Sequence, residues 1–176
     1  MMSKKKVNSW DLWDTLISRC VIEPTIIFVI MEVLSGKIEF KKKRIEAEKK
    51  SRIDSNETNL DRIYDFMEYS NQDIQYLKSL EIELEKKLAV PIVENISKFQ
   101  GSDIIISDMY LPKNVLLDIL DKFAISIKPI NFFLSNEINL TKKDGELFQY
   151  VSEKLYIIRH TGDNKISDIK QAKKNK

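Results

Sequence analysis

Ser9-Trp10-Asp11-Leu12-Trp13-Asp14-Thr15 is the stretch that decides how the rest of the chain is interpreted. It overlaps a short run, residues 7–12, that we predict to be the first strand. An acid at the carboxyl end of a strand projects into the crevice where open α/β sheets bind ligands, so Asp11 is a candidate for a working carboxylate. Asp is also common in ordinary polar turns. The interpretation of Asp11 therefore depends on whether later segments supply matching groups.

Three later segments of the chain carry polar residues that could act together with Asp11. They read Ile104-Ile105-Ile106-Ser107-Asp108-Met109-Tyr110, then Leu140-Thr141-Lys142-Lys143-Asp144-Gly145-Glu146-Leu147-Phe148, then His160-Thr161-Gly162-Asp163-Asn164 with Ser167-Asp168. The isoleucine-rich run 103–107 is typical of a parallel strand buried on both faces. Further strands are predicted over residues 130–135 and 156–160. We expect the polar segments to converge on Asp11 in one pocket.

With these four segments the chain resembles the haloacid dehalogenase-like (HAD) superfamily. The resemblance is to a bacterial branch whose proteins read like SFDVFDTL, SDMYL, TK..GELF and H.GDN..SD, where this chain reads SWDLWDTL, SDMYLP, TKKDGELF and HTGDNKISD. All four motifs occur in the family's order across nearly the whole chain. The resemblance implies an α/β fold with a Rossmann-like core, a parallel sheet and a helical cap inserted after the first motif. It also implies one or more further strands after the last motif, so we expect a missing tail or a further domain beyond Lys176.

The order of predicted elements indicates the same fold class. Strand and helix patterns alternate in the second half of the chain, which is typical of a parallel sheet with right-handed crossovers. Helical stretches between the first and second motifs are predicted over residues 24–36, 37–53, 58–69 and 72–88, followed by one over residues 91–99. We therefore predict a core of residues 1–21 plus 90–176 and a helical cap of residues 22–89.

The composition fits a globular protein and sets limits on its partners. Of 176 residues 43% are hydrophobic, and the formal net charge of +2 does not call for a nucleic-acid partner. The lone Cys20 cannot form an internal disulfide, which favours a reducing compartment. No signal peptide and no apolar run near 18 residues is visible, so we predict a cytoplasmic protein without a membrane span.

The resemblance implies Mg²⁺-dependent hydrolysis of a small phosphorylated substrate. Asp11 would be the nucleophile, forming an aspartyl-phosphate intermediate that water then hydrolyses. Mg²⁺ would contact Asp11, the backbone carbonyl of Trp13 and Asp163, since this hard cation prefers oxygen ligands. Asp168 would complete the metal surroundings through water or orient the catalytic lysine.

Two further residues would stabilise the transferred group. Ser107 would donate a hydrogen bond to a phosphoryl oxygen, and Lys142 would offset negative charge. We prefer Lys142 to its neighbour Lys143 because it directly follows Thr141, as in the family pattern. His160, the only histidine, is predicted to pack or to bond backbone at a strand end.

The first motif departs from the family in one position. Most superfamily phosphatases carry a second Asp two residues after the nucleophile, which acts as general acid and base, and this chain has Trp13 there. Loss of such a group typically costs about 10² to 10⁴ in rate. Asp14, one position later, is a candidate replacement. The alternatives are a catalytically weak or non-catalytic module of a larger cell-surface polysaccharide biosynthesis protein, and dehalogenase or phosphonatase chemistry.

The substrate side is predicted from the motifs and the helical cap. Thr15, Asp108 and Asn164 stand inside the motifs. Arg44 and Glu48 are four residues apart and share a helix face, which is typical of a surface ion-pair ladder. Related sequences carry a similar pattern here, which implies instead that both residues line the roof of the active site.

Overall fold

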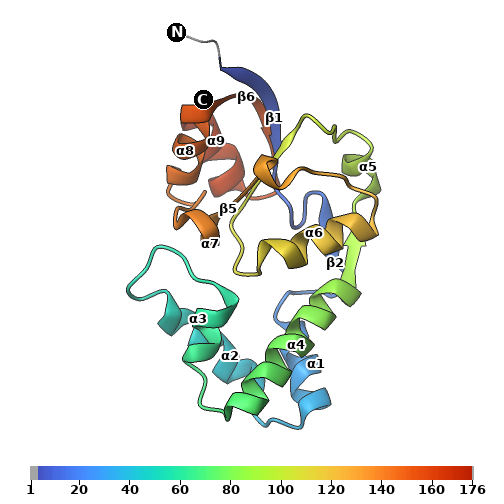
Figure 1. Ribbon diagram of the computed structural model, residues 1–176, viewed down its shortest axis with the longest axis vertical. Helices are drawn as coiled ribbons and strands as arrows, with labels where there is room; N and C mark the ends of the chain where they lie inside the picture. The colour runs from blue at the N-terminus through green and yellow to red at the C-terminus, as the bar shows by residue number, and fades with distance from the viewer. Residues whose placement is uncertain (1–3, 176) are drawn as a thin grey trace.

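A four-stranded parallel sheet forms the centre of the computed structural model, which describes residues 4–175, so residues 1–3 and 176 of the predicted core lie outside it. The strand order is β5-β4-β1-β6, with β1 and β4 inside and β5 and β6 at the edges. The strands are β1 Lys5–Trp10, β4 Ile104–Ser107, β5 Phe132–Leu134 and β6 Leu155–Thr161. The predicted α/β class and parallel sheet are confirmed (Figure 1).

Both faces of the sheet are covered, as the isoleucine run predicts. Every residue of β4 is buried, and its side chains alternate between two hydrophobic clusters. Ile105 packs in the cluster that contains α6 (Lys113–Lys122), whereas Ile104 and Ile106 pack in the cluster that contains α8 (Glu146–Lys154). The sheet is therefore a layer between helices, and its ligands can reach it only at the ends of the strands.

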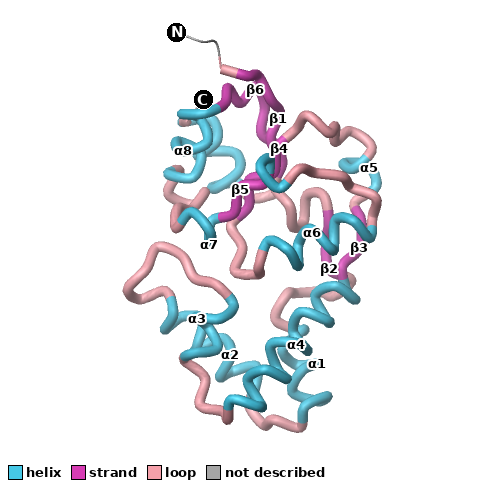
Figure 2. Tube along the Cα trace, in the orientation of Figure 1, coloured by secondary structure: helices cyan, strands magenta, loops and turns pink. Residues whose placement is uncertain are grey.

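The chain between the first two motifs forms a helical insertion, named here by its helices α1 to α4. They are α1 Ile26–Ser35, α2 Phe40–Ser51, α3 Leu60–Asp65 and α4 Asn71–Leu88. Gly36 ends α1 in the left-handed conformation, with φ of 67°. The side chains of Asn59 and Ser70 cap α3 and α4. A helix occurs in each of the four predicted places, although α3 is shorter than the predicted range 58–69, and Figure 2 shows the four helices grouped below the sheet.

A short ribbon joins the insertion to the sheet, and the sequence analysis missed it. Strand β2, Ile17–Arg19, pairs antiparallel with β3, Ala89–Pro91. The helix predicted over residues 91–99 is wrong at its start, because Pro91 ends β3 and the helix is limited to α5, Val93–Ile96. Three-residue strands are too short to show a periodic pattern, which is why the ribbon gave no signal.

The other end of the core also differs in detail. Residues 129–131 form a 3₁₀ turn (η1, Pro129–Asn131) before β5, so that strand is shorter than predicted. The helix predicted from Ser167 begins earlier, as a π-helix, η2 (Lys165–Gln171), which continues into α9, Ala172–Lys174. Within residues 4–175, no helix combines the length and apolar character needed to cross a bilayer.

Arg44 is fully buried inside the helical insertion, so the predicted surface ion-pair ladder is wrong for it. Its guanidinium donates to both carboxylate oxygens of Glu81 in α4, at 3.0 and 2.8 Å, and to Glu48 at 3.1 Å. The Tyr64 hydroxyl donates to the same Glu81 carboxylate at 2.7 Å. Arg44 also lies over the ring of Tyr110, a residue that follows β4, at 4.9 Å. This buried polar cluster ties three helices together and to the core.

A second arginine links the ribbon to the insertion. Arg19 of β2 donates to both carboxylate oxygens of Glu85 in α4, at 2.8 and 3.1 Å. Its guanidinium also lies 3.7 Å from the centre of the Trp13 ring. Arg19 thereby connects Trp13 of the first motif to α4.

Candidate active site

The motif residues meet at the carboxyl edge of the parallel sheet. Asp11 follows β1, and its backbone N–H donates to the carbonyl of Thr161, the last residue of β6, at 2.8 Å. Ser107 is the last residue of β4, and Asp163 follows β6 by two residues. Parallel strands end at the same edge, so residues as far apart in the sequence as Asp11 and Asp163 are brought together.

Lys142 is the centre of the cluster. Its ammonium lies 2.7 Å from the Asp11 carboxylate and 2.6 Å from the Asp168 carboxylate, and all three residues are buried. Burial works against the charged ammonium, but the two carboxylates outweigh it and raise the pKa of Lys142 above its ordinary value. The cluster thus holds a permanent positive charge beside Asp11. Lys143, in contrast, is exposed.

Three carboxylates form a group that could hold a metal ion. Oxygens of Asp11, Asp163 and Asp168 all lie within 4.8 Å of one another. Burial and the negative charge of Asp11 raise the pKa of Asp163, so the ionised form of Asp163 is destabilised. A cation bound beside it would stabilise that form. Oxygen donors of this kind suit a hard divalent cation.

Asp168 is the member of this group with the least capacity left for a metal. Its Oδ1 accepts from Lys142 and its Oδ2 accepts from the backbone N–H of Asn164, at 3.0 Å. Although burial opposes ionisation, bonds from His160 and Lys142 lower the pKa of Asp168 to about 2. A Cβ at Gly162 would lie 2.4 Å from the Asp168 carboxyl carbon, so a glycine is needed for this approach. Asp168 is therefore paired with Lys142 in the structure, and its two expected roles, at the metal and in orienting Lys142, stay predictions.

His160 belongs to the cluster, which the sequence analysis missed. Its Nε2 lies 3.2 Å from Asp168 Oδ1, and its Nδ1 lies 2.8 Å from the Ser9 hydroxyl. Burial lowers the pKa of His160, so the ring is neutral at pH 7 and has one donor and one acceptor nitrogen. If Nε2–H donates to Asp168 and Nδ1 accepts from the Ser9 hydroxyl, then His160, Asp168 and Ser9 all have hydrogen-bond partners. Asp168 lies eight residues after His160, inside a π-helix, whose geometry leaves no spacing signal in the sequence.

A cavity of about 360 Å³ opens in front of the cluster. Its walls include Asp11 and Lys142 from the cluster, Trp13 from the first motif, and Asp163 and Asn164 from the last. Asn164 also caps the π-helix, because its side-chain oxygen accepts from the N–H groups of the next turn. The cavity is of a size to hold a small ligand at the Asp11 carboxylate.

Asp14 also lines this cavity, and its backbone is unusual. It adopts the left-handed conformation, with φ of 56°, and its carboxylate accepts from the Ser18 hydroxyl at 2.6 Å. Asp14 is exposed, whereas Trp13 is buried. The turn therefore presents the carboxylate of Asp14 to the open side of the cavity. Position 13, where most superfamily phosphatases carry the second acid, is occupied by the buried Trp13.

Four of the predicted residues are not among the walls of this cavity. Ser107 is buried at the end of β4 and is not among the cavity walls. Thr15 is buried and, within residues 4–175, its hydroxyl has no hydrogen-bond partner. Arg44 and Glu48 contact each other inside the helical insertion, and neither lines this cavity.

Asp108 lines the cavity beside Lys142. Its carboxylate oxygens accept from the backbone N–H of Lys142 at 2.8 and 3.0 Å. Burial raises the pKa of Asp108 from 3.8 to about 6, and the negative charges of Glu57 and Asp11 contribute to this rise. Its ionised form is therefore less stable in the folded protein than in the unfolded chain.

Changing Asp108 to asparagine is expected to raise the free energy of unfolding at pH 8 by up to about 3 kcal/mol, since each pKa unit corresponds to about 1.4 kcal/mol. The folded protein holds this proton more tightly, so wild-type stability falls as the pH rises from about 4 through 6. Asparagine keeps an acceptor for Lys142 without the charge. Urea unfolding of both proteins at pH 4 and pH 8, without divalent cations, measures the difference. Parallel stability profiles over that range would contradict the prediction.

Four segments that are far apart in the chain thus supply one buried lysine, three clustered carboxylates and a cavity beside Asp11. The cluster can combine a carboxylate able to act as a nucleophile, the ammonium of Lys142 and a metal ion held by carboxylates. No protein-family model matches the chain, and no curated protein matches it.

Proposed function

We propose that the protein is a Mg²⁺-dependent, HAD-like phosphohydrolase that acts on a small phosphorylated metabolite. The observation that supports this most directly is the Lys142 ammonium 2.7 Å from Asp11, beside carboxylates that can hold a cation. A carboxylate must approach an anionic phosphate ester, and that approach requires nearby positive charge. A buried lysine with a raised pKa supplies that charge at every physiological pH.

In the first step, an oxygen of Asp11 attacks phosphorus and the bond from phosphorus to the leaving-group oxygen breaks. This gives an aspartyl phosphate and releases an alcohol once the leaving oxygen takes a proton. In the second step, water attacks the aspartyl phosphate, which regenerates the Asp11 carboxylate and releases inorganic phosphate. Lys142 stabilises negative charge in both steps, and Asp168 with His160 holds it in position.

Asp11 and Asp163 would hold the Mg²⁺ ion, because both have carboxylate oxygens at the cavity and Asp168 is already engaged. When bound, Mg²⁺ supplies positive charge that screens the substrate phosphate from Asp11. The backbone carbonyl of Trp13 is the third expected contact. Ser107 would bond a phosphoryl oxygen only after a change at the cavity floor, since it is buried.

Asp14 is our candidate for the acid that protonates the leaving group. It lines the same cavity as Asp11, and Ser18 fixes its carboxylate. The helical insertion would act as the cap, which closes over the site and excludes water from it. Arg19, stacked on Trp13 and paired with Glu85, would couple the position of that cap to the first motif.

Removing divalent cations is expected to lower phosphate release from p-nitrophenyl phosphate at least about 100-fold, since a metal supplies several kcal/mol of charge stabilisation. Treatment with EDTA followed by dialysis gives the metal-free protein, and release of inorganic phosphate is the measurement. Added Mg²⁺ should restore turnover. Ca²⁺ should restore little, since it is larger and takes more ligands.

Turnover that EDTA leaves unchanged, or the absence of phosphate release from every ester tested, would contradict the proposal. Halide release from a haloacid, or phosphate release from a phosphonate, would favour the dehalogenase or phosphonatase alternative instead. Ligand binding without any turnover would favour a non-catalytic module.

A further inference from the structure

A second cavity, of about 600 Å³, adjoins the candidate active site. One wall is the loop between α2 and α3, which contributes Arg52, Asn56 and Glu57, and the other wall belongs to the core. Asp108 and Lys143 line this cavity as well as the one in front of Asp11. The two cavities therefore meet, and the second is where the rest of a ligand would lie if its phosphate were at Asp11.

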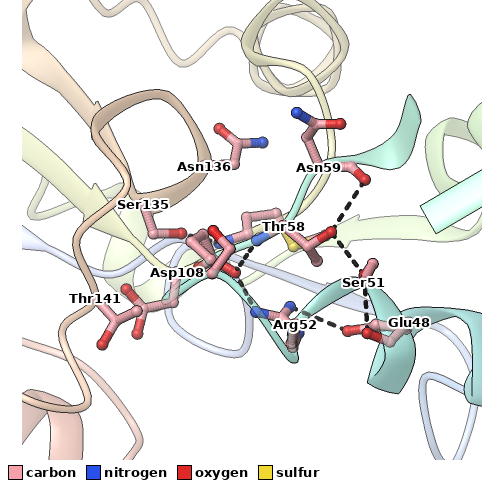
Figure 3. A network of polar contacts seen from close by, with 12 residues as sticks. Glu48, Ser51, Arg52, Thr58, Asn59, Asp108, Ser135, Asn136 and Thr141 are labelled. Carbon is pink, nitrogen blue, oxygen red and sulfur yellow. Dashed lines mark hydrogen bonds and ion pairs between the residues drawn. The ribbon is translucent and has the colours of Figure 1, made fainter. Parts of the chain in front are cut away.

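The loop that forms the wall is held in place by its own polar contacts. Arg52 contacts the Glu57 carboxylate and donates to Glu48 at 3.1 Å, while Glu57 accepts from the backbone N–H of Thr58 at 2.9 Å. The Thr58 hydroxyl donates to Ser51 at 2.8 Å. Figure 3 shows part of this chain of contacts, with Arg52 bonded to Glu48 and with Ser51 between Glu48 and Thr58. The polar groups of the loop are thus preorganised on the side that faces the core.

The walls of this cavity consist of polar and charged residues. The wall residues are all polar or charged, and none is aromatic or aliphatic; those from the core are Asp108, Thr141, Lys143 and Asp144. The cations Arg52 and Lys143 stand against three acidic residues, so the cavity is not strongly charged in one sense. Donors and acceptors therefore occur side by side.

This lining selects among the common leaving groups. A hydroxyl group both donates and accepts, so a ligand with several hydroxyls can use a wall of mixed donors and acceptors. A nucleobase is usually bound by stacking on an aromatic side chain, and an aryl or acyl group needs apolar walls. No aromatic or aliphatic residue occurs among the wall residues of this cavity.

We infer that the second cavity binds the leaving group of the substrate and that this leaving group is polyhydroxylated, a sugar or a polyol. The inference rests on the proposed phosphohydrolase function and names its substrate class. Glu57 and Asn56 are the cap-side specificity residues, because both line this cavity and neither lines the one at Asp11. Asp108 lines both cavities, so it lies where the phosphate of the substrate would be joined to the leaving group.

The test compares ligands that share a phosphate and differ in the remainder. Calorimetric binding to the Asp11→Asn protein, with Mg²⁺, is measured for hexose and pentitol monophosphates, for a nucleoside monophosphate and for inorganic phosphate. Sugar and polyol phosphates should bind at least tenfold more tightly than inorganic phosphate, and the nucleotide should not. Wild-type kcat/KM for a sugar phosphate and for p-nitrophenyl phosphate is measured in parallel.

Two variants and one control locate the effect. Glu57→Gln and Asn56→Ala should each lower the ratio of kcat/KM for the sugar phosphate to that for p-nitrophenyl phosphate at least fivefold. Asp54→Asn, an exposed change in the same loop, should leave the ratio unchanged. Circular dichroism checks folding. Asn56 is exposed, so its variant still tests the inference if loss of the buried Glu57 carboxylate prevents folding.

The inference and the proposed function fail in different ways. Equal binding of sugar phosphates and inorganic phosphate, or an unchanged ratio in both variants, would overturn the assignment of the cavity while phosphate release persists. Tight binding of sugar phosphates with no release from any ester would support the cavity and refute the phosphohydrolase.

Discussion

Changing Asp11 to asparagine is expected to reduce phosphate release from p-nitrophenyl phosphate by at least about 10⁴-fold, because removal of a nucleophile removes the reaction path that it opens. An amide oxygen does not form the acyl phosphate, and the change also removes one carboxylate from the metal group. Lys142 keeps its partner Asp168 at 2.6 Å, so the fold should survive. The measurements are kcat with saturating Mg²⁺ and the melting temperature of the same preparation.

Asp14→Asn is the companion variant in this experiment. Asparagine can still accept from Ser18, but it has no proton to give to a leaving group. It should slow hydrolysis of alkyl phosphates by about 10² to 10⁴ and change p-nitrophenyl phosphate turnover little. If Asp11→Asn retained a few per cent of wild-type turnover, Asp11 could not be the nucleophile.

Replacing Arg44 with methionine is expected to lower the free energy of unfolding by about 3–5 kcal/mol, because it leaves a buried charge without its partner. Glu81 is fully buried and receives two hydrogen bonds from Arg44. Tyr64 alone would remain to bond it. Urea unfolding at pH 7, followed by circular dichroism, gives the difference.

The double variant Arg44→Met with Glu81→Gln separates charge from packing. Glutamine can still accept from Tyr64, and no buried anion remains, so most of the lost stability should return. Glu48→Gln, at a carboxylate that is partly exposed, should cost no more than about 1 kcal/mol. A loss below about 1 kcal/mol for the single change at Arg44, or a double variant no better than it, would refute this account.

Most of the strands and helices could be predicted from the sequence because the patterns that indicate them are local. A run of isoleucines over β4 and the helical spacing of apolar residues in α1 and α4 each specify an element without reference to the rest of the chain. The β2–β3 ribbon could not be predicted, since three-residue strands form only where distant segments pair. The burial of Arg44 was hidden for the same reason: α2 is highly charged, and its partner Glu81 is 37 residues away.

The candidate site divides in a similar way. The motif resemblance predicted Asp11, Lys142, Asp163 and Asp168, and the structure brings them together. The same motifs did not reveal that His160 bonds Asp168, nor that Asp14 occupies a left-handed turn. The first depends on the π-helix that carries Asp168, and the second on the backbone conformation of a single residue. The loop that forms the second cavity carries no motif at all, so only its fold places Glu57 opposite Asp108.

The β2–β3 ribbon gives the molecule a modular construction. Arg19, near the point where the chain leaves for the helices, is paired with Ala89, where it returns. Directly opposed residues of antiparallel strands lie about 5 Å apart. One set of helices could therefore be transplanted for another, longer or shorter, without altering how the four parallel strands align. Such a junction would let the chemistry that we propose at the sheet stay fixed while evolution, or an engineer, replaces the helices that we propose as the cap.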